Sequence, residues 1–185
     1  MKKYPKYKPS NIDWIGDIPV HWEVKALKRL AKICNGQDHK KVWDENGKYP
    51  IIGTGGTFGY TDSYLHEGPS VILGRKGTID KPMFYSGKIW TVDTLFYTHS
   101  FKNVFPKFIF NQFQRINWKE YNEASGVPSL SKSTIEKIEI SIPCLAEQTQ
   151  IANFLSAIDA KIKQTDLQIA KTEQWKRGLL QQMFV

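Results

Sequence analysis

Cysteine and long apolar runs are scarce in this sequence, and their scarcity excludes two classes of protein. Cys34 and Cys144 are the two cysteines in 185 residues, too few for a disulfide-rich secreted scaffold. No apolar run approaches the roughly 20 residues that cross a bilayer. The basic N-terminus is not followed by the apolar segment of a signal peptide. We therefore expect a cytoplasmic protein that does not cross a membrane and whose thiols are reduced.

The motifs of several enzyme classes are also missing. The glycine-rich stretch 53–59 has Phe58 where the dinucleotide-binding spacing requires glycine, and no G-x-x-x-x-G-K-S/T phosphate loop occurs. There is no Asn/Asp-Pro-Pro-Tyr/Phe loop of the kind that DNA adenine methyltransferases use. The histidines and cysteines are scattered without metal-ligand spacing. These absences predict a chain that holds no cofactor or metal of its own.

One weak catalytic pattern remains. Asp17, followed by Glu23 and Lys25, superficially matches an acid…Glu-x-Lys arrangement that places Mg²⁺ near a lysine. Such spacings often arise by chance, and Trp22 and Val24 are expected to pack in a helix. A small Mg²⁺-dependent nuclease is therefore kept only as an alternative function.

The excess of positive charge lies in the first three quarters of the chain. The net charge is +8; residues 1–143 hold 21 Lys and Arg against 14 Asp and Glu (+7), and residues 144–185 hold 5 against 4 (+1). A basic domain in a chain that is 13% aromatic favours nucleic acid as a partner. The alternatives are a solvated basic surface and a basic domain that binds an acidic protein.

The C-terminal stretch predicts a long helix with an apolar seam. Ten positions spaced four and three residues apart form this seam, and seven of them are apolar: Ile151, Leu155, Ile158, Ile162, Thr165, Ile169, Thr172, Lys176, Leu179 and Met183. A helix from Ala146 to Phe184 is about 58 Å long, against a diameter of roughly 30–40 Å for a domain of this size. We expect the helix to extend beyond its domain and pair with a second helix; folding back along its own domain is the alternative.

The preceding residues mix helix and strand patterns, so the predicted fold class is α+β: a mixed globular domain followed by one long helix. The arm at residues 4–20 is expected to be extended. The predicted elements are a helix at 22–34, a hairpin around Asn46-Gly47, a strand at 70–73, a hairpin around Ser86-Gly87, a strand at 95–101, a helix at 106–118 and a strand at 138–142. Ser131 or Ser133 is expected to cap a short helix.

Three segments combine turn-forming residues with hydrogen-bonding and basic side chains. They are 53–62, 74–78 with Lys81 behind it, and 125–132. Arginine is shaped to read guanine and lysine suits a phosphate. The simpler interpretation is ordinary tight turns with solvated charges. The candidate DNA-binding residues are Thr54, Gly55, Gly56, Thr57, Tyr60, Arg75, Lys76, Thr78, Lys81, Ser129, Ser131 and Lys132.

The order of these motifs resembles the specificity (S) subunit of Type I restriction-modification enzymes. The opening YKPSNIDWIGDIPVHWEV, residues 7–24, looks like the usual beginning of that family. Residues 51–62, 71–79 and 125–130 are similar to segments of its target recognition domain. Residues 140–152, ISIPCLAEQTQIA, resemble the start of its conserved spacer helix, with Cys144 where a proline is common.

The resemblance implies a function that spacing alone does not. In that family the S subunit is not catalytic, and each target recognition domain reads one half of a split DNA sequence. The conserved helices form an antiparallel coiled coil that separates two such domains. Modification subunits, which use S-adenosylmethionine, dock on this scaffold, and restriction subunits add ATP- and Mg²⁺-dependent cleavage. The cofactors are therefore expected in partner subunits and none in this chain.

The chain departs from the family in length, because it carries one recognition domain and one helix. It is expected to be a natural half-subunit, a truncated product or a fragment, with a DNA-binding domain at 1–143 and a spacer helix at 144–185. A half-subunit restores the whole by homodimerising through Ile151, Leu155, Ile158, Ile162, Ile169, Leu179 and Met183. Two identical domains would then read an inverted repeat. The sequence does not give the DNA target.

Overall fold

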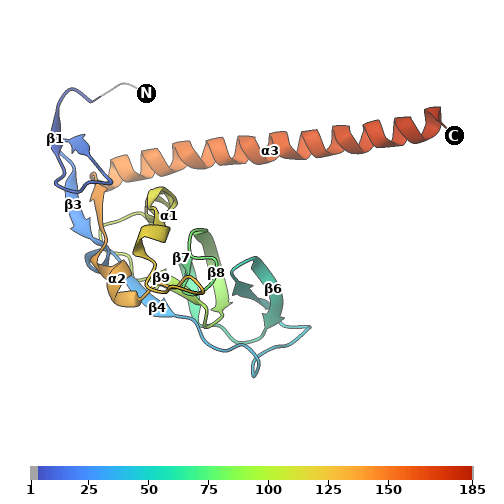
Figure 1. The fold of residues 1–185 in the computed structure, drawn as a ribbon, viewed down its shortest axis with the longest axis horizontal. Helices are drawn as coiled ribbons and strands as arrows, with labels where there is room; N and C mark the ends of the chain where they lie inside the picture. The colour runs from blue at the N-terminus through green and yellow to red at the C-terminus, as the bar shows by residue number, and fades with distance from the viewer. Residues whose placement is uncertain (1–3, 185) are drawn as a thin grey trace. The chain divides into compact units, whose positions relative to one another are not determined.

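A six-stranded sheet carries the core of the larger of two structural units (Figure 1). The computed structural model describes residues 4–184, and they divide between Thr149 and Gln150. The strands are β1 (Tyr7–Pro9), β2 (Asp17–Pro19), β3 (Glu23–Ala26), β4 (Lys32–Asn35), β5 (Tyr49–Gly53), β6 (Gly56–Thr61), β7 (His66–Gly74), β8 (Met83–Thr91), β9 (Leu95–His99) and β10 (Glu139–Ile142). The helices are η1 (Leu27–Arg29), α1 (Pro106–Arg115), η2 (Trp118–Tyr121), α2 (Lys132–Lys137) and α3 (Leu145–Met183). The predicted α+β class is confirmed.

The large sheet runs in the order β4-β9-β7-β8-β5-β6 and must be curled. Ile89 of β8 pairs with His66 at the start of β7, whereas Leu95 of β9 pairs with Gly74 at its end. A straight strand from His66 to Gly74 would span about 27 Å. Six residues, which is the distance in sequence from Ile89 to Leu95, reach about 20 Å at most. The sheet therefore bends and brings the end of β8 back toward the start of β9.

The inside of this bend is filled by β-branched and other apolar side chains. Ile51, Ile72, Ile89 and Leu95 have no exposed surface and belong to one cluster. Each such burial contributes about 1.5–3 kcal/mol relative to an exposed side chain. The predicted strand at 70–73 is confirmed as the buried end of β7, and the predicted strand at 95–101 is confirmed as β9.

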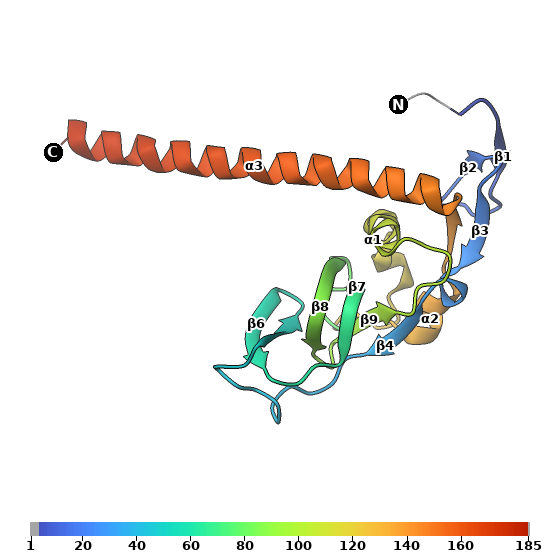
Figure 2. The same cartoon turned by 180° about the vertical axis from the view of Figure 1, so that it is seen from behind.

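Helix α1 lies against β7 and β8, and α2 lies against β4 and η1 (Figure 2). Pro106 opens α1, where its fixed φ suits a first turn. Ile109 and Phe113, which share one face of the predicted helix at 106–118, are buried, and Phe108 is buried as well. That helix ends at Arg115, and Trp118 begins η2 instead, with its Nε1 donating to Phe113 O at 2.7 Å.

The predicted helix at 22–34 is wrong. These residues form β3, η1 and β4, because β3 pairs with the distant β10 and β4 pairs with β9. Val24, Leu27 and Leu30 have helical spacing, but they are buried or half-buried by partners that one sequence does not reveal.

Both predicted hairpins are also wrong. Gly87 lies inside the continuous strand β8, opposite Gly68 of β7, and both glycines have positive φ. They mark a bend in a strand pair, as glycines inside strands often do. Residues 42–47 form turns beside β6, and a Cβ on Gly47 would lie 2.3 Å from Thr61 N. The real hairpin joins β5 to β6.

The predicted long helix is confirmed as α3, which has 39 residues and is therefore about 58 Å long. Glu147 lies in its first turn, where the helix dipole favours an acid. The predicted last strand is confirmed as β10, immediately before it.

Candidate nucleic-acid interface

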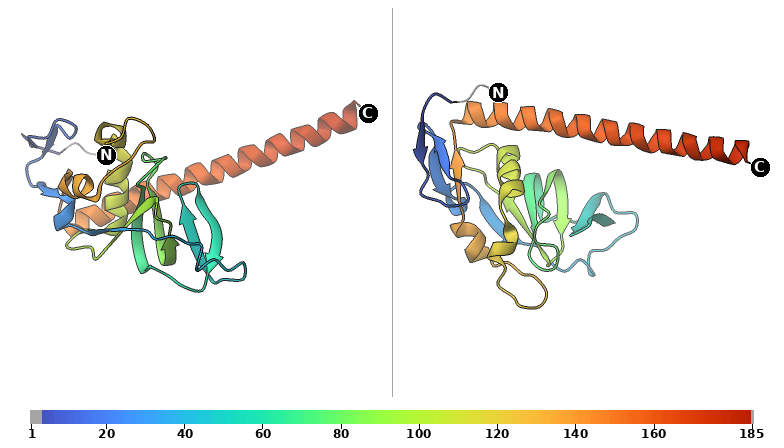
Figure 3. Two further views of the ribbon diagram at one scale, coloured as in Figure 1. Left: turned by 60° about the horizontal axis from the view of Figure 1, so that its bottom comes forward. Right: turned by 45° about the horizontal axis from the view of Figure 1, so that its top comes forward.

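The loop that carries Arg75 is held against the loop that carries Ser129. Lys76 and Ser129 form an antiparallel bridge. Gly77 N donates to Pro128 O at 2.9 Å, and Leu130 N donates to Arg75 O at 2.9 Å. Two of the three predicted DNA-binding segments therefore form one surface, although β8, β9 and α1 lie between them in sequence. The right-hand view of Figure 3 shows the connection between η2 and α2 as a wide loop beside α2.

Two glycines make the turn after β7 possible. A Cβ on Gly74 would lie 1.9 Å from Thr78 O, so the backbone closes on itself where a side chain would stand. Gly77 has φ +82°, a conformation that favours glycine. The turn presents Lys76 to solvent, leaves Arg75 and Thr78 half-buried, and is followed by exposed Lys81.

The backbone of Arg75 is fixed while most of its guanidinium stays available. Arg75 N donates to Thr94 O at 2.8 Å, and Lys76 N donates to the same oxygen at 3.2 Å. Arg75 Nη1 donates to Asp93 O at 3.3 Å. A guanidinium has five N–H donors, so this bond steers the side chain and leaves donors for a ligand.

The end of β5, just before the turn of the β5–β6 hairpin, bonds to the same segment of chain. Val92 N donates to Ile52 O at 3.1 Å, next to the Asp93 and Thr94 carbonyls that hold Arg75. Thr54 and Gly55 form this turn and Gly56 opens β6 with φ +105°. Residues 92–94 therefore bond to the end of β5 and to the 74–78 loop, and the 74–78 loop bonds in turn to residues 128–130.

Turn-forming residues predicted a loop over 53–62, and this is wrong, because most of the segment is the edge strand β6. Thr57 and Tyr60 are exposed on this strand, and Tyr60 lies four residues from Gly56, about 13 Å along it. Asp44 N donates to Tyr60 O at 3.0 Å, so the chain at 42–47 covers part of the edge.

Sequence reasoning missed an exposed aromatic cluster beside Tyr60. The ring centroids of Trp43 and Phe58 are 5.7 Å apart, and His39 lies 5.1 Å from Phe58. Trp43 is 43% exposed and Phe58 48% exposed. The Trp43 ring occupies the space that a Cβ on Gly59 would need. The sequence gives little signal for this cluster, because Trp43 and Phe58 are fifteen residues apart and apolar Ile51 and Ile52 lie between them.

The side chain of Ser131 caps the N-terminus of α2. Its Oγ accepts from Thr134 N at 3.1 Å, as the predicted cap required. The Ser131 and Thr134 hydroxyls also bond to each other, and the hydrogen bonds that Thr134 and then Ser131 make to Glu123 hold the pKa of that carboxyl below its usual value. Lys132 Nζ lies 3.6 Å from Glu136 Oε1 one helical turn later, on the exposed side of α2.

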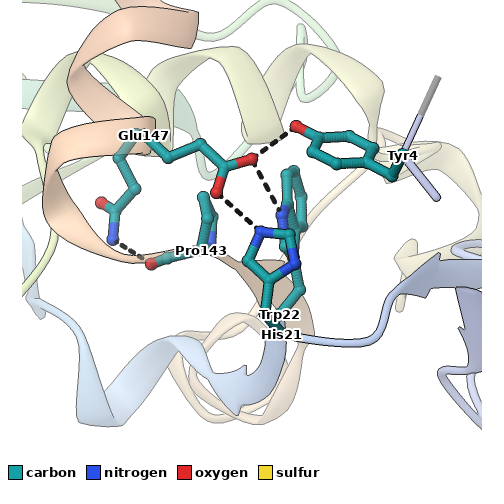
Figure 4. Close-up of polar contacts among 6 residues, drawn as sticks. Tyr4, His21, Trp22, Pro143 and Glu147 are labelled. Carbon is teal, nitrogen blue, oxygen red and sulfur yellow. Dashed lines mark hydrogen bonds and ion pairs between the residues drawn. The ribbon is translucent and has the colours of Figure 1, made fainter. Parts of the chain in front are cut away.

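The first turn of α3 is part of the larger unit and is hydrogen-bonded to other residues of that unit (Figure 4). The Glu147 carboxylate accepts from the Tyr4 hydroxyl and from Trp22 Nε1 at 3.2 Å, and it pairs with His21 Nε2 at 2.9 Å. The hydrogen bond to Glu147 is the main reason that the pKa of Tyr4 rises to about 12. The neighbouring Gln148, 1% exposed, accepts from Phe105 N at 2.8 Å.

A family model described as "Type I restriction modification DNA specificity domain" matches residues 19–172. The chain belongs to this family. The match contains the 74–78 and 128–130 loops, Glu147 and most of α3, and the predicted resemblance to S subunits is confirmed.

Curated specificity subunits resemble this specificity domain at low identity. The Type I restriction enzyme MjaVIII specificity subunit of Methanocaldococcus jannaschii is 25% identical and matches 90% of this chain and 43% of its own length. The EcoDI specificity subunit of Escherichia coli is 25% identical over 86% of this chain and 36% of its own length. The chain thus spans less than half the length of these relatives.

Solved structures share the fold. The S subunit of a Type I restriction-modification system from M. genitalium matches with a TM-score of 0.66 and 17% identity, over 77% of this chain and 40% of its own. At this identity the likeness shows the fold alone.

The seam residues of the specificity domain lie along α3. Ile158, Ile162, Ile169 and Met183 are exposed, the last at 73%. Ile151, Leu155 and Leu179 are half-buried. Apolar side chains off the predicted seam are exposed as well, namely Phe154, Leu167, Trp175 and Leu180. Within residues 4–184, no helix is long and apolar enough to cross a membrane.

The residues of the alternative nuclease pattern lie on two strands that follow one another in sequence but belong to different sheets. Asp17 begins β2, and Glu23 and Lys25 lie on β3. Lys25 Nζ is 2.6 Å from Glu23 Oε2, and this pair, with both groups exposed, holds the pKa of the Glu23 carboxyl below its usual value. The arrangement is an ordinary surface ion pair.

Proposed function

We propose that this chain recognises a specific sequence in double-stranded DNA through the joined 74–78 and 128–130 loops. The observation that carries the proposal is their backbone pairing at Lys76 and Ser129. This pairing holds the loop that carries Arg75 and Lys76 in one position, and base recognition requires side chains that are positioned by a rigid support. The basic charge of residues 1–143 supports the same function.

The two basic side chains of the 74–78 loop take different roles in this proposal. Arg75 is held by Thr94 O and Asp93 O and keeps free donors, which suits a bidentate bond to O6 and N7 of a guanine. Lys76 is exposed and suits a phosphate. Thr54, Gly55 and Gly56 lie at the neighbouring turn, where their backbone can approach the duplex.

Co-expression with modification subunits tests this function directly. Adenine methylation of the host genome at one bipartite motif is expected when the chain is present and not when it is omitted. Random methylation, or none, would refute sequence recognition by the chain.

Binding to a duplex that contains the motif and to a scrambled duplex then distinguishes residues that read bases from residues that bind phosphates. Arg75→Ala should lower the preference for the motif by about 1–3 kcal/mol, and Lys132→Ala should weaken binding to both duplexes alike. Equal losses on both duplexes for Arg75→Ala would remove its role as a base reader.

The chain supplies no chemistry in this proposal. Modification subunits bring S-adenosylmethionine, and restriction subunits bring ATP- and Mg²⁺-dependent cleavage. Purified chain incubated with plasmid and Mg²⁺ is expected to leave the plasmid intact. Cleavage that Glu23→Gln abolishes would instead support the nuclease alternative.

We further propose that α3 pairs with α3 of a second copy in an antiparallel coiled coil. The support is the row of exposed apolar residues at heptad spacing, which includes Ile158, Ile162 and Ile169. Light scattering over a concentration series should give about twice the 21.3 kDa of one chain.

A double variant tests the proposed seam. Ile158→Asp with Ile162→Asp should give a folded monomer, whereas Lys161→Asp with Gln164→Asp, off the predicted seam, should leave the dimer. A dimer that survives the first change would exclude this seam.

A further inference from the structure

A basic pocket lies at the C-terminal end of α2, away from Lys132 at its start. The pocket has a volume of about 280 Å³, and Lys25, Lys28, Arg29 and Lys137 line it with one acid, Glu139. It forms where β3 and η1 meet the end of α2 and the start of β10, and Leu27 N donating to Ile138 O at 2.9 Å joins the two sides. None of the candidate DNA-binding residues lines it.

Three of the four basic side chains of this pocket form no ion pair within residues 4–184, and Glu139 is the one acid among them. Lys25 pairs with Glu23 at 2.6 Å. Lys28, Arg29 and Lys137 are exposed and form no ion pair with any residue in the part of the chain that the structure describes. Like charges gathered around one hollow repel each other, so a bound anion would stabilise this arrangement.

Helix α2 connects this pocket to the recognition loops. Leu130 N bonds to Arg75 O, Ser131 caps α2, and Lys132 begins it. Lys32 of β4 pairs with His99 of β9, and α2 lies against β4 and η1. Backbone hydrogen bonds thus join the Arg75 loop to the start of α2, and Lys132 and Lys137 lie at the two ends of this helix.

The spacing of the lysines at the two ends of α2 fits a nucleic-acid backbone. Lys132 and Lys137 are five residues apart, about 7.5 Å along a helix. One strand of B-DNA places a phosphate every 3.4 Å or so along its axis. Neighbouring phosphates lie further apart through space than this rise, because the strand winds around the axis, so the two ends of α2 are separated by about one phosphate-to-phosphate step.

We propose that Lys28, Arg29 and Lys137 bind phosphates of the DNA strand that continues past the base pairs contacted by the Arg75 loop. This inference rests on the proposed DNA recognition and adds a site that fixes how the duplex lies on the domain. DNA is chosen over an acidic protein because one continuous polyanion accounts for both the loop surface and the pocket.

Phosphate contacts of this kind have a characteristic signature in salt. Each contact adds about 0.9 to the slope of log K against log salt concentration and carries no sequence preference. Lys28→Ala, Arg29→Ala and Lys137→Ala combined should reduce that slope by about 2–3 on both the motif duplex and the scrambled duplex. The ratio of the two affinities should stay at the wild-type value.

The matched control removes the same charge elsewhere. Lys161→Ala, Lys163→Ala and Lys171→Ala on α3 should leave the slope unchanged. A second variant, Lys28→Arg, Arg29→Lys and Lys137→Arg, keeps the charges and should retain most of the wild-type slope. All of these side chains are exposed, and circular dichroism verifies that each variant folds.

The outcomes separate this inference from the function on which it rests. A triple alanine variant with the slope of the control would overturn the phosphate site while wild-type discrimination stood. Loss of modification-subunit binding with an unchanged DNA slope would assign the pocket to an acidic protein and also overturn it. A wild-type chain that binds neither duplex would overturn both proposals.

Discussion

At the scale of single residues, the space around Gly74 decides whether the Arg75 loop can form. A methyl group there would collide with Thr78 O, which is backbone and cannot rotate away. Gly74→Ala is therefore expected to destabilise the domain by about 1–3 kcal/mol, a typical cost of overpacking. Denaturant unfolding measures it.

Gly126 provides a control in the neighbouring loop. A Cβ there meets nothing within 4 Å and its φ is not positive, so Gly126→Ala should change stability by less than about 0.5 kcal/mol. Equal effects at both glycines would show that the turn after β7 relaxes more easily than its geometry indicates.

Residue types predicted the positions of the 74–78 and 128–130 loops better than they predicted the role of each side chain in those loops. Arg75 and Lys76 were chosen for charge and adjacent glycines, and they do lie on a joined surface. The sequence predicted Ser131 both as a candidate helix cap and as a DNA contact, and in the structure its hydroxyl caps α2. Trp43 was not selected, because its neighbour Phe58 lies fifteen residues away and only the fold brings them together.

At the scale of elements, α2 is short enough for its cap to matter. Ser131→Ala should lower the free energy of unfolding by about 1 kcal/mol, because Thr134 N loses its acceptor. Ser133→Ala, at the exposed neighbour of that cap, is the control and should be close to neutral. Motif preference is expected to survive both changes. A loss of preference without a loss of stability would instead make Ser131 a DNA contact.

The start of α3 should be sensitive to acid. Partial burial raises the pKa of Glu147, but the hydrogen bonds from Tyr4, His21 and Trp22 outweigh it and hold the pKa below its usual value. A glutamate whose pKa is lower in the folded state than in the unfolded state stabilises the fold at pH values above its unfolded pKa of about 4.3. This stabilisation is lost as the pH falls from there through the folded pKa. Glu147→Gln should therefore cost about 1.5–3 kcal/mol at pH 7, and less as pH falls below about 4.

Denaturant unfolding of Glu147→Gln against wild type between pH 3 and 7 checks this dependence. Glu173→Gln, on an exposed position of α3, should show no such trend. A difference between wild type and Glu147→Gln that stays constant across this range would mean that the carboxylate charge is not what holds the first turn.

Elements were predictable where their pattern is local and long. Helix α3 repeats an apolar seam over many turns, and its predicted ends are each one residue from the observed ones. The stretch 22–34 has helical spacing but is built from strands, because its hydrogen bonds go to β9 and β10. Likewise, Ser86-Gly87 has the composition of a turn, but it lies inside β8. Gly87 is paired with Gly68 of β7, and the sequence does not reveal this partner.

At the scale of the whole molecule, the proposed dimer constrains the DNA that is read. Two identical chains paired through α3 are related by a two-fold axis, so their recognition loops present the same Arg75 and Lys76 to opposite strands. The target is then two inverted copies of one half-site, separated by base pairs that are not read.

Methylation sequencing tests this symmetry. In cells that contain this chain and modification subunits, but no other S subunit, the methylated motif is expected to equal its own reverse complement. Arg75→Ala should relax the same position in both halves, because one substitution alters both copies. A motif with two unrelated halves would require a second, different recognition domain and would exclude the homodimer as the reading unit. The seam variant Ile158→Asp with Ile162→Asp should abolish methylation while leaving each domain folded. A single recognition domain then binds one half-site alone, and non-specific phosphate contacts decide the affinity of that domain for DNA.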